Sequence, residues 1–168
     1  MTLYHGSNAI VETPDLTHTF KTLDFGKGFY TTSNKRQAVN FTLRVIERHG
    51  GKRILNTYNF EKNEAYAKLE ICIFEKADKT WLDFVAQNRQ GVYKDKKYDI
   101  IYGPVADDRV YQTLILYSDG IFTTDDALKR LATFKLYSQY VFTSEEALKY
   151  LHFINSEEIT EVSNGKNN

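Results

Sequence analysis

Three polar segments that lie far apart in the sequence carry the residues able to do chemistry. The first is His5-Gly6-Ser7, at the end of a short expected strand, and it offers an imidazole, a hydroxyl group and an approachable backbone. Glycine allows a ligand to come close to main-chain N–H and C=O groups. A single histidine near a strand end is usually structural, so this segment alone is a weak indication of a site.

The second segment, Gly26–Tyr30 (GKGFY), places two glycines around Lys27 before an aromatic strand, and it leads into Asn40-Phe41. One interpretation is a glycine hairpin followed by core aromatic residues. A phosphate-binding loop is another, but the glycine spacing fits neither the Walker nor the dinucleotide fingerprint. The third segment is Leu136–Phe142, in which Gln139 is a polar residue inside an aromatic strand. Its simplest interpretation is an outward-facing polar position.

In their order and spacing, the three segments resemble the ADP-ribosyltransferase superfamily, in its diphtheria-toxin-like and poly(ADP-ribose) polymerase-like branch. Members of that branch carry a His-Gly-Ser strand, then a Gly-Lys-Gly-aromatic-Tyr strand that leads to a helix with an Asn-aromatic pair. A late strand then carries Glu or another polar residue. Residues 1–155 also look like an uncharacterised, toxin-like bacterial family of the same clan.

The resemblance implies an α+β fold of split antiparallel β-sheets with flanking helices. It implies one domain over residues 1–156 and a polar C-terminal tail over residues 157–168. It also implies that NAD is the ADP-ribose donor and that no metal is needed. The catalytic residues would be His5, Tyr30 and Gln139. The NAD-binding residues would be His5, Gly6, Ser7, Lys27, Gly28, Tyr30, Asn40 and Phe41.

The resemblance further gives most of these residues a role. The Gly6 backbone would bind the carboxamide of nicotinamide, while His5, assisted by Ser7, would hydrogen-bond the adenosine ribose. Tyr30 would stack on one face of the nicotinamide ring and Phe41 on the other. Electron-rich aromatic faces suit this ring, because its nitrogen carries a formal positive charge in NAD.

Gln139 would reach the nicotinamide ribose, and it is the position where the sequence departs from the common Glu. Breaking the glycosidic bond leaves an oxocarbenium-like ribose, which a hydrogen-bond acceptor on a ribose hydroxyl stabilises in a dry site. Glutamine keeps the acceptor and loses the charge. In polymerising relatives the Glu helps to activate the acceptor ribose. The resemblance therefore predicts transfer of a single ADP-ribose, or NAD hydrolysis, and no polymer.

The leading hypothesis is a mono-ADP-ribosyltransferase that modifies an unidentified protein or nucleic acid. The bacterial family that the chain resembles is often encoded beside a small companion protein, which suggests a toxin neutralised by a small antitoxin protein. The alternative is a catalytically silent NAD-binding or interaction module, with Gln139 as the sign of lost activity. A third hypothesis, RNA 2′-phosphate transfer, needs a basic substrate face, against which the zero net charge argues.

Two arginines are further candidates for binding the NAD pyrophosphate. Arg89 follows an apolar helix, and Arg109 follows Asp108 just after Gly103-Pro104, where a solvated turn is the simpler interpretation. The three remaining histidines have no metal-like spacing: His18, His49 and His152.

The composition narrows the function classes. Lys plus Arg and Asp plus Glu number 22 each, so no overall charge draws the chain to nucleic acid or membranes. The single cysteine, Cys72, excludes an internal disulfide and a multi-cysteine zinc site, and we expect it to be a small buried hydrophobe. No signal-peptide pattern and no apolar run near the ~20 residues of a membrane span are present, which predicts a cytoplasmic protein.

The elements that must position these residues can be read coarsely. Strands are expected at residues 2–5, 54–60, 68–74, 98–102 and 140–142, and helices at 78–88 and 109–117. Ser33 or Asn34 should cap a helix that ends at Gly50-Gly51. Two further helices should begin at capping boxes, Thr123 with Asp126 and Thr143 with Glu146. Strands and helices mix without regular alternation, which also favours an α+β fold.

Overall fold

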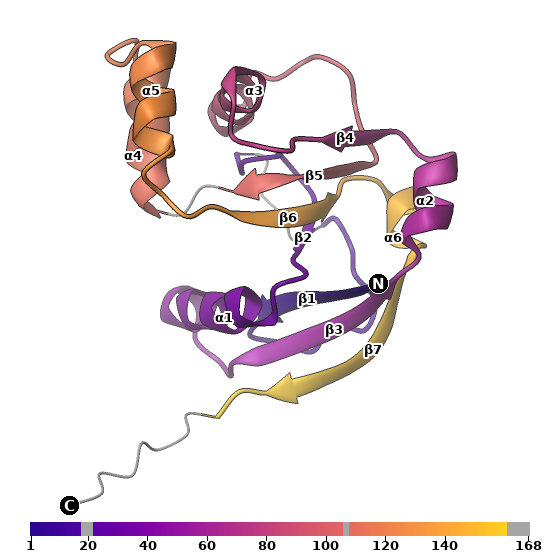
Figure 1. The fold of residues 1–168 in the computed structure, drawn as a ribbon. Coiled ribbons are helices and arrows are strands. Elements are labelled where there is room, and N and C mark those ends of the chain that lie inside the picture. Colours follow the sequence, from indigo (N-terminus) through magenta and orange to yellow (C-terminus); the bar gives the residue numbers. More distant parts are fainter. Residues whose placement is uncertain (18–21, 106–107, 161–168) are drawn as a thin grey trace, which may run out of the picture.

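Two sheets, joined by one backbone bridge, form the frame of the molecule (Figure 1). The computed structural model describes residues 1–17, 22–105 and 108–160, apart from the side chains of residues 108 and 109. The described residues form β1 (Thr2–Ser7), β2 (Phe29–Thr31), α1 (Lys35–His49), β3 (Ile54–Phe60), α2 (Lys62–Lys68), β4 (Ile71–Ile73), α3 (Lys79–Gln90), β5 (Ile100–Val105), α4 (Asp108–Ser118), α5 (Thr124–Leu131), β6 (Tyr137–Phe142), α6 (Glu145–Leu148) and β7 (Leu151–Glu158). The predicted α+β class is confirmed.

Sheet A has the strand order β1-β3-β7 and is antiparallel throughout. Sheet B has the order β2-β6-β5-β4, in which only the β4–β5 pair is parallel. The bridge joins β1 of sheet A to the end of β2: Tyr4 N–H donates to Thr32 O at 2.8 Å, and Thr32 N–H donates to Tyr4 O at 3.0 Å. The N-terminal strand and the glycine-aromatic strand are therefore neighbours.

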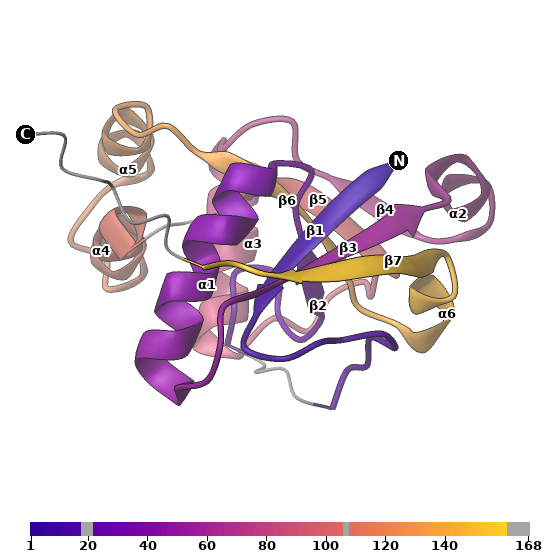
Figure 2. The same cartoon turned by 90° about the horizontal axis from the view of Figure 1, so that it is seen from below.

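Two apolar cores hold the layers together. The first lies between the sheets and includes Leu3, Tyr58, Phe60 and Phe142, with the short helices α2 and α6 at one end (Figure 1). The second packs sheet B against α3, α4 and α5 around Trp81. The remaining long helix, α1, covers the other face of sheet A beside β1 and β3 (Figure 2).

The helix ends follow from capping groups that the sequence displays. Asn34 accepts the Gln37 N–H at 3.1 Å and starts α1, and Gly50 ends it at φ 70°. At α5, Thr123 and Asp126 form the expected capping box. The second box is wrong: Ser144 is the cap of α6 and accepts the Ala147 N–H, because the Thr143 hydroxyl donates to carbonyls of the loop before β5.

The strand at 54–60 is confirmed, but the four other strand predictions need correction, among them the one at 140–142, because β6 begins at Tyr137. β1 continues to Ser7, and of the expected strand 68–74 only Ile71–Ile73 belongs to a strand, since α2 extends to Lys68. β5 does not stop before Gly103-Pro104 but runs to Val105. Tyr102 O accepts from Phe74 N–H on the β4 side of β5. The backbone of Pro104 faces that same side, but it lies beyond the residues that pair with β4. The β4–β5 ladder therefore loses no hydrogen bond because proline has no N–H.

β7 was not expected from the sequence, and it changes the C-terminal boundary. The strand runs to Glu158, past the boundary expected at residue 156. Lys35 and Lys52 of the α1 region pair with Glu157 and Glu158, respectively. The rest of the expected tail, residues 161–168, lies outside the described residues. Within the described part of the chain, no helix has the length and apolar character to cross a membrane.

Candidate functional site

The backbone of Gly6 is turned away from its sheet neighbour. Along β1, Met1 O accepts from Phe60 N–H of the β3 side, whereas Tyr4 N–H and C=O both bond to Thr32 of the β2 side. Backbone groups of alternate residues point to opposite sides of an antiparallel strand. The N–H and C=O of Gly6 therefore point toward β2, past the bridge. Among the described residues, neither group is used by the β1–β3 ladder or by that bridge.

Gly6 also has a packing reason to be glycine. A Cβ atom at this position would lie 2.3 Å from Ala38 O and 3.0 Å from Thr42 Cγ2, both on α1. The absent side chain thus lets α1 approach β1 closely. The same residue serves helix packing on one face of sheet A and, as far as the described residues show, keeps its backbone groups out of the β1–β3 ladder.

The side chain of His5 forms a hydrogen bond from sheet A to sheet B, one residue after the Tyr4–Thr32 bridge. Its Nδ1 lies 2.8 Å from Tyr30 O, and its ring lies against Phe29 with 4.4 Å between centroids. Since a carbonyl only accepts, Nδ1 carries the proton of the neutral ring and Nε2 is an acceptor. Burial lowers the pKa of His5 below its ordinary value, against a smaller opposing effect of the bond to Tyr30. The histidine is therefore neutral at pH 7.

Tyr30 is held by the backbone of the turn before β2. Its hydroxyl accepts from Phe25 N–H at 3.0 Å and donates to Gly26 O at 2.8 Å. Burial, and next the negative charge of Asp24, raise the pKa of this hydroxyl well above its ordinary value. Tyr30 therefore keeps its proton at neutral pH and presents a fixed, uncharged ring.

Strand register places Gln139 on the same face of sheet B as Tyr30. Tyr30 pairs with Val141 of β6, and Gln139 lies two residues before Val141 on the same strand. Paired residues and every second residue of a strand share one face. Tyr30 and Val141 pack toward α3, so half-buried Gln139 belongs to that face. The structure thus joins His5 to Tyr30 directly and places Gln139 diagonally across the sheet from Tyr30.

Helix α1 contributes Phe41 to this neighbourhood. Gln37 Oε1 accepts from the Thr32 hydroxyl at 2.8 Å, so the Gln37 flank of α1 faces the end of β2. Phe41 lies one turn further on the same flank and is 45% exposed. Asn40, in contrast, is exposed and lies about 200° around the helix from Ala38, which contacts Gly6. The structure does not bring Asn40 to the other candidates.

The remaining expected NAD-binding residues differ in their surroundings. Gly28 is explained by packing, because a Cβ atom there would lie 2.5 Å from Val141 Cγ1 and 2.9 Å from Phe142 O. Lys27 is exposed on the turn before β2. The Ser7 hydroxyl accepts from Ala9 N–H at 3.3 Å, at the end of β1.

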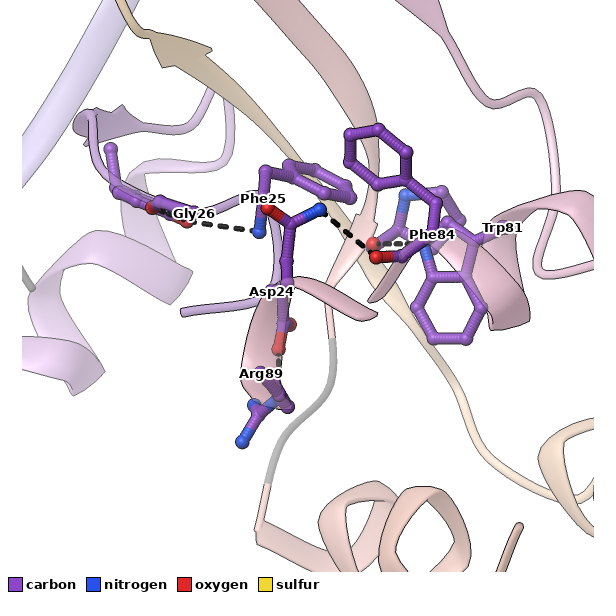
Figure 3. A network of polar contacts seen from close by, with 9 residues as sticks. Asp24, Phe25, Gly26, Trp81, Phe84 and Arg89 are labelled. Atoms are coloured by element: carbon purple, nitrogen blue, oxygen red, sulfur yellow. Dashed lines mark hydrogen bonds and ion pairs between the residues drawn. The ribbon is translucent and has the colours of Figure 1, made fainter. Parts of the chain in front are cut away.

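An ion pair that the sequence did not suggest lies near the Tyr30 hydroxyl. Asp24, whose side chain is 6% exposed, pairs with Arg89 of α3, whose side chain is 24% exposed (Figure 3). The guanidinium also lies over the Tyr111 ring, 4.5 Å from its centroid. Arg89, one of the two arginines considered for the NAD pyrophosphate, is thus engaged by Asp24 and Tyr111. The side chains of Asp108 and Arg109 lie outside the described residues.

A second unexpected group fixes the loop after β1. The buried side chain of Asn56 accepts from Val11 N–H at 2.9 Å and donates to Ala9 O at 3.1 Å. Tyr58 OH donates to Val11 O at 2.6 Å. Asn56 and Tyr58 occupy alternate positions of β3, and the sequence gave no signal that their side chains would hold the loop after β1. The loop is thereby held against β3 next to His5, which pairs with Asn56.

Two cavities lie elsewhere, between α3, α4 and α5. The larger is about 440 Å³ and its lining includes Gln87, Tyr117 and Phe122, and the smaller is about 140 Å³ and includes Arg89 and Tyr111. Neither is lined by the residues of the three sequence segments. In the described part of the chain, no three side chains of the metal-binding types come together. Half-buried Cys72 has a thiol whose pKa is raised by burial.

Comparison with known proteins gives a family. The model of the family described as "Protein of unknown function (DUF3990)" matches residues 1–153. The chain belongs to this family. The match contains every described element up to the start of β7, and with them all the candidate residues. No curated protein and no solved structure matches the chain. The DUF3990 description carries no activity, so the function has to be argued from the site.

Proposed function

We propose that this DUF3990 protein is a mono-ADP-ribosyltransferase that binds NAD where β1 and β2 diverge. The observation that carries the proposal is the backbone of Gly6, which points toward β2 beside His5 and Tyr30 and, among the described residues, bonds neither in the β1–β3 ladder nor at the bridge. Two separate sheets, for which the Tyr4–Thr32 pair is the one backbone bridge among the described residues, also suit the split-sheet architecture of ADP-ribosyltransferases.

The nicotinamide end of NAD fits this chemistry. A carboxamide has one donor group and one acceptor, which match the C=O and N–H of Gly6. The ring would stack on Tyr30, whose orientation its two hydroxyl bonds fix, with the exposed Phe41 on the other face. Aromatic faces favour the cationic ring of bound NAD, and they favour it less once nicotinamide becomes neutral. The same contacts would therefore allow the product to leave.

His5 would contribute an acceptor to the adenosine ribose. Its Nδ1–H is occupied by Tyr30 O, so Nε2 is the atom that would receive a ribose hydroxyl proton in a hydrogen bond. Because the ring is neutral, the pair of bonds fixes the orientation of the imidazole without burying a charge.

In the proposed reaction, the bond between nicotinamide nitrogen and ribose C1′ breaks. Its electron pair leaves with nicotinamide, which becomes neutral, and the ribose becomes an oxocarbenium ion. A lone pair of the acceptor then attacks C1′, and the acceptor's proton passes to solvent. Gln139 Oε1 would accept a hydrogen bond from a hydroxyl of the nicotinamide ribose and stabilise the cation. Without a carboxylate at this position, one ADP-ribose is transferred and no chain is built.

The acceptor in this proposal is a protein or nucleic acid, with water as the competing nucleophile. A toxin role, with a small antitoxin protein as partner, is the biological setting that the sequence resemblance suggests. Incubation of the purified protein with labelled NAD and a bacterial extract tests the reaction. We expect single ADP-ribose units on a macromolecule, and ladders of polymer would contradict the assignment.

The alternative is a silent NAD-binding or interaction module. It is favoured by Gln139, which lacks the charge of the usual glutamate. NAD consumption separates the two functions: the enzyme turns over, and Gln139→Ala and His5→Ala reduce the rate. Tight NAD binding without turnover in the wild type would support the module.

A further inference from the structure

Asp24 is a buried carboxylate tied to a different layer of the molecule. It is 5% exposed, it lies in the segment that leads into β2, and it pairs with Arg89 Nε of α3. Arg89 in turn lies over Tyr111 of α4. The pair therefore ties the segment before β2 to α3, and through Tyr111 to α4. Removing one partner from a buried ion pair is destabilising, so the pair restrains the chain on both sides.

The two residues that follow Asp24 are the ones that hold Tyr30. Phe25 N–H donates to the Tyr30 hydroxyl, and that hydroxyl donates to Gly26 O. Gly26 adopts φ 74°, and its N–H donates to Leu23 O at 3.0 Å, which closes a tight turn. Residues 24–26, which we call the Asp24–Gly26 turn, thus place the ion pair one residue from the groups that bind Tyr30 (Figure 3).

The Phe25 side chain anchors the same turn a second time. Its ring packs in the second core against Phe74 and Phe84, with centroids 6.0 and 6.1 Å away. Gly103 makes room for it, since a Cβ atom there would lie 3.3 Å from Phe25 Cζ and 2.8 Å from Phe74 Cβ. The turn is fixed by an apolar anchor and by an ion pair, and its backbone presents a donor and an acceptor to one hydroxyl.

We propose that Asp24 and Arg89 are positioning residues for the NAD site, because their ion pair sets the Asp24–Gly26 turn that fixes the Tyr30 ring. This inference rests on the proposed function. β6 pairs with the backbone of Tyr30, but the direction in which the ring points is held by the two bonds of its hydroxyl. A ring already held in its bound orientation loses less conformational freedom when a ligand stacks on it.

NAD affinity of a set of full-length variants tests the proposal. Asp24→Asn should raise the Kd for NAD about tenfold, and Tyr30→Phe should have a similar effect. The double variant should bind no more weakly than about the weaker single variant, because both changes remove the same restraint. Asp83→Asn is the matched control. Asp83 is an ion-paired carboxylate on α3, the helix of Arg89, and it accepts a hydrogen bond from Tyr117. The Kd of this variant for NAD should stay within about twofold of the wild-type value. Effects of Asp24→Asn and Tyr30→Phe that simply add would overturn the proposal.

A readout that needs no NAD separates this inference from the proposed function. In protein with ¹³C-labelled tyrosine rings, the Tyr30 signal is the one that Tyr30→Phe removes. Asp24→Asn should displace it and Asp83→Asn should not. An unmoved signal in folded Asp24→Asn protein would overturn the positioning role, as would a displaced signal with unchanged NAD affinity. If the wild type binds no NAD, the proposed function fails, while the Tyr30 signal still decides whether the pair holds the ring. Should Asp24→Asn not fold, Asp24→Asn with Arg89→Gln replaces it, because the charges of both partners of the pair are then removed.

Discussion

At the scale of single residues, the proposal depends on which atoms are donors and acceptors. His5 is kept neutral by burial and keeps one tautomer through Tyr30 O, which leaves Nε2 for a ligand. The Tyr30 hydroxyl both accepts from and donates to the backbone of the Asp24–Gly26 turn, so the ring is the part of the side chain that remains for a ligand. Gln139 is the acceptor without charge. Each of these assignments makes a measurable prediction.

NAD affinity should depend on pH through His5. The folded-state pKa lies below the ordinary 6.5, so the ring is already neutral at pH 7 and raising the pH changes nothing. As the pH falls through this lowered pKa, Nε2 gains a proton and becomes a donor, and the bond to a ribose hydroxyl is lost. Calorimetric titrations between about pH 8 and about pH 5 should show constant Kd at first and weaker binding only below about 6.5. His5→Ala should bind NAD weakly, and its Kd should not depend on pH over this range. A loss of NAD affinity in the wild type that begins above pH 7 would contradict this prediction.

Gln139 should limit the rate of NAD cleavage. Gln139→Glu restores a charge that stabilises an oxocarbenium ion, so nicotinamide release should be faster by about tenfold or more, and Gln139→Ala should slow it by a similar factor. Gln112→Glu, the same change at an exposed position of α4, is the control and should have no effect. Chromatography of released nicotinamide measures all four proteins. Equal rates for Gln139→Ala and the wild type would exclude Gln139 from the reaction.

At the scale of elements, the proposed site lies where α1 contacts β1 and where β1 and β2 diverge. Capping residues and regular patterns made α1 and β3 predictable from the sequence, and the order of the His5 and Tyr30 segments indicated that their strands belong to one site. Polar, mostly exposed β7 offered no alternating pattern. The Asp24–Arg89 pair joins residues 65 positions apart, and no local rule specifies such a contact.

Gly6→Ala should destabilise the contact between α1 and β1. The new methyl group meets Ala38 O, a backbone atom that cannot turn aside, so we expect a loss of about 1–3 kcal/mol in the free energy of unfolding. Adding Thr42→Ser removes the second close atom but not the first, and should not restore stability. Ser7→Ala on the same strand is the control and should cost within about 0.5 kcal/mol. Urea denaturation followed by circular dichroism measures these values; an unchanged midpoint for Gly6→Ala would refute the close contact.

At the scale of the whole molecule, the proposed site draws on both sheets and is linked to the helical layer of α3, α4 and α5 through the Asp24–Arg89 pair. In the proposal, sheet A with α1 supplies Gly6, His5 and Phe41, sheet B supplies Tyr30 and Gln139, and Arg89 of α3 pairs with Asp24 of the Asp24–Gly26 turn. A ligand bound there would touch both sheets and should raise the stability of the entire domain, by about 2.7 kcal/mol at a hundred times its Kd. The cavities between α3, α4 and α5 are the competing location for a ligand.

The backbone amide of Gly6 gives the most direct test of the account. The chain has nine glycines, so ¹⁵N-glycine labelling yields a simple amide spectrum after sequential assignment. Gly120 lines the larger cavity between the helices and serves as the internal comparison. With NAD added, the Gly6 signal should shift and its hydrogen exchange should slow, while Gly120 stays unchanged. A shift of Gly120 with Gly6 unmoved, or no change at either glycine, would contradict NAD binding at the divergence of β1 and β2.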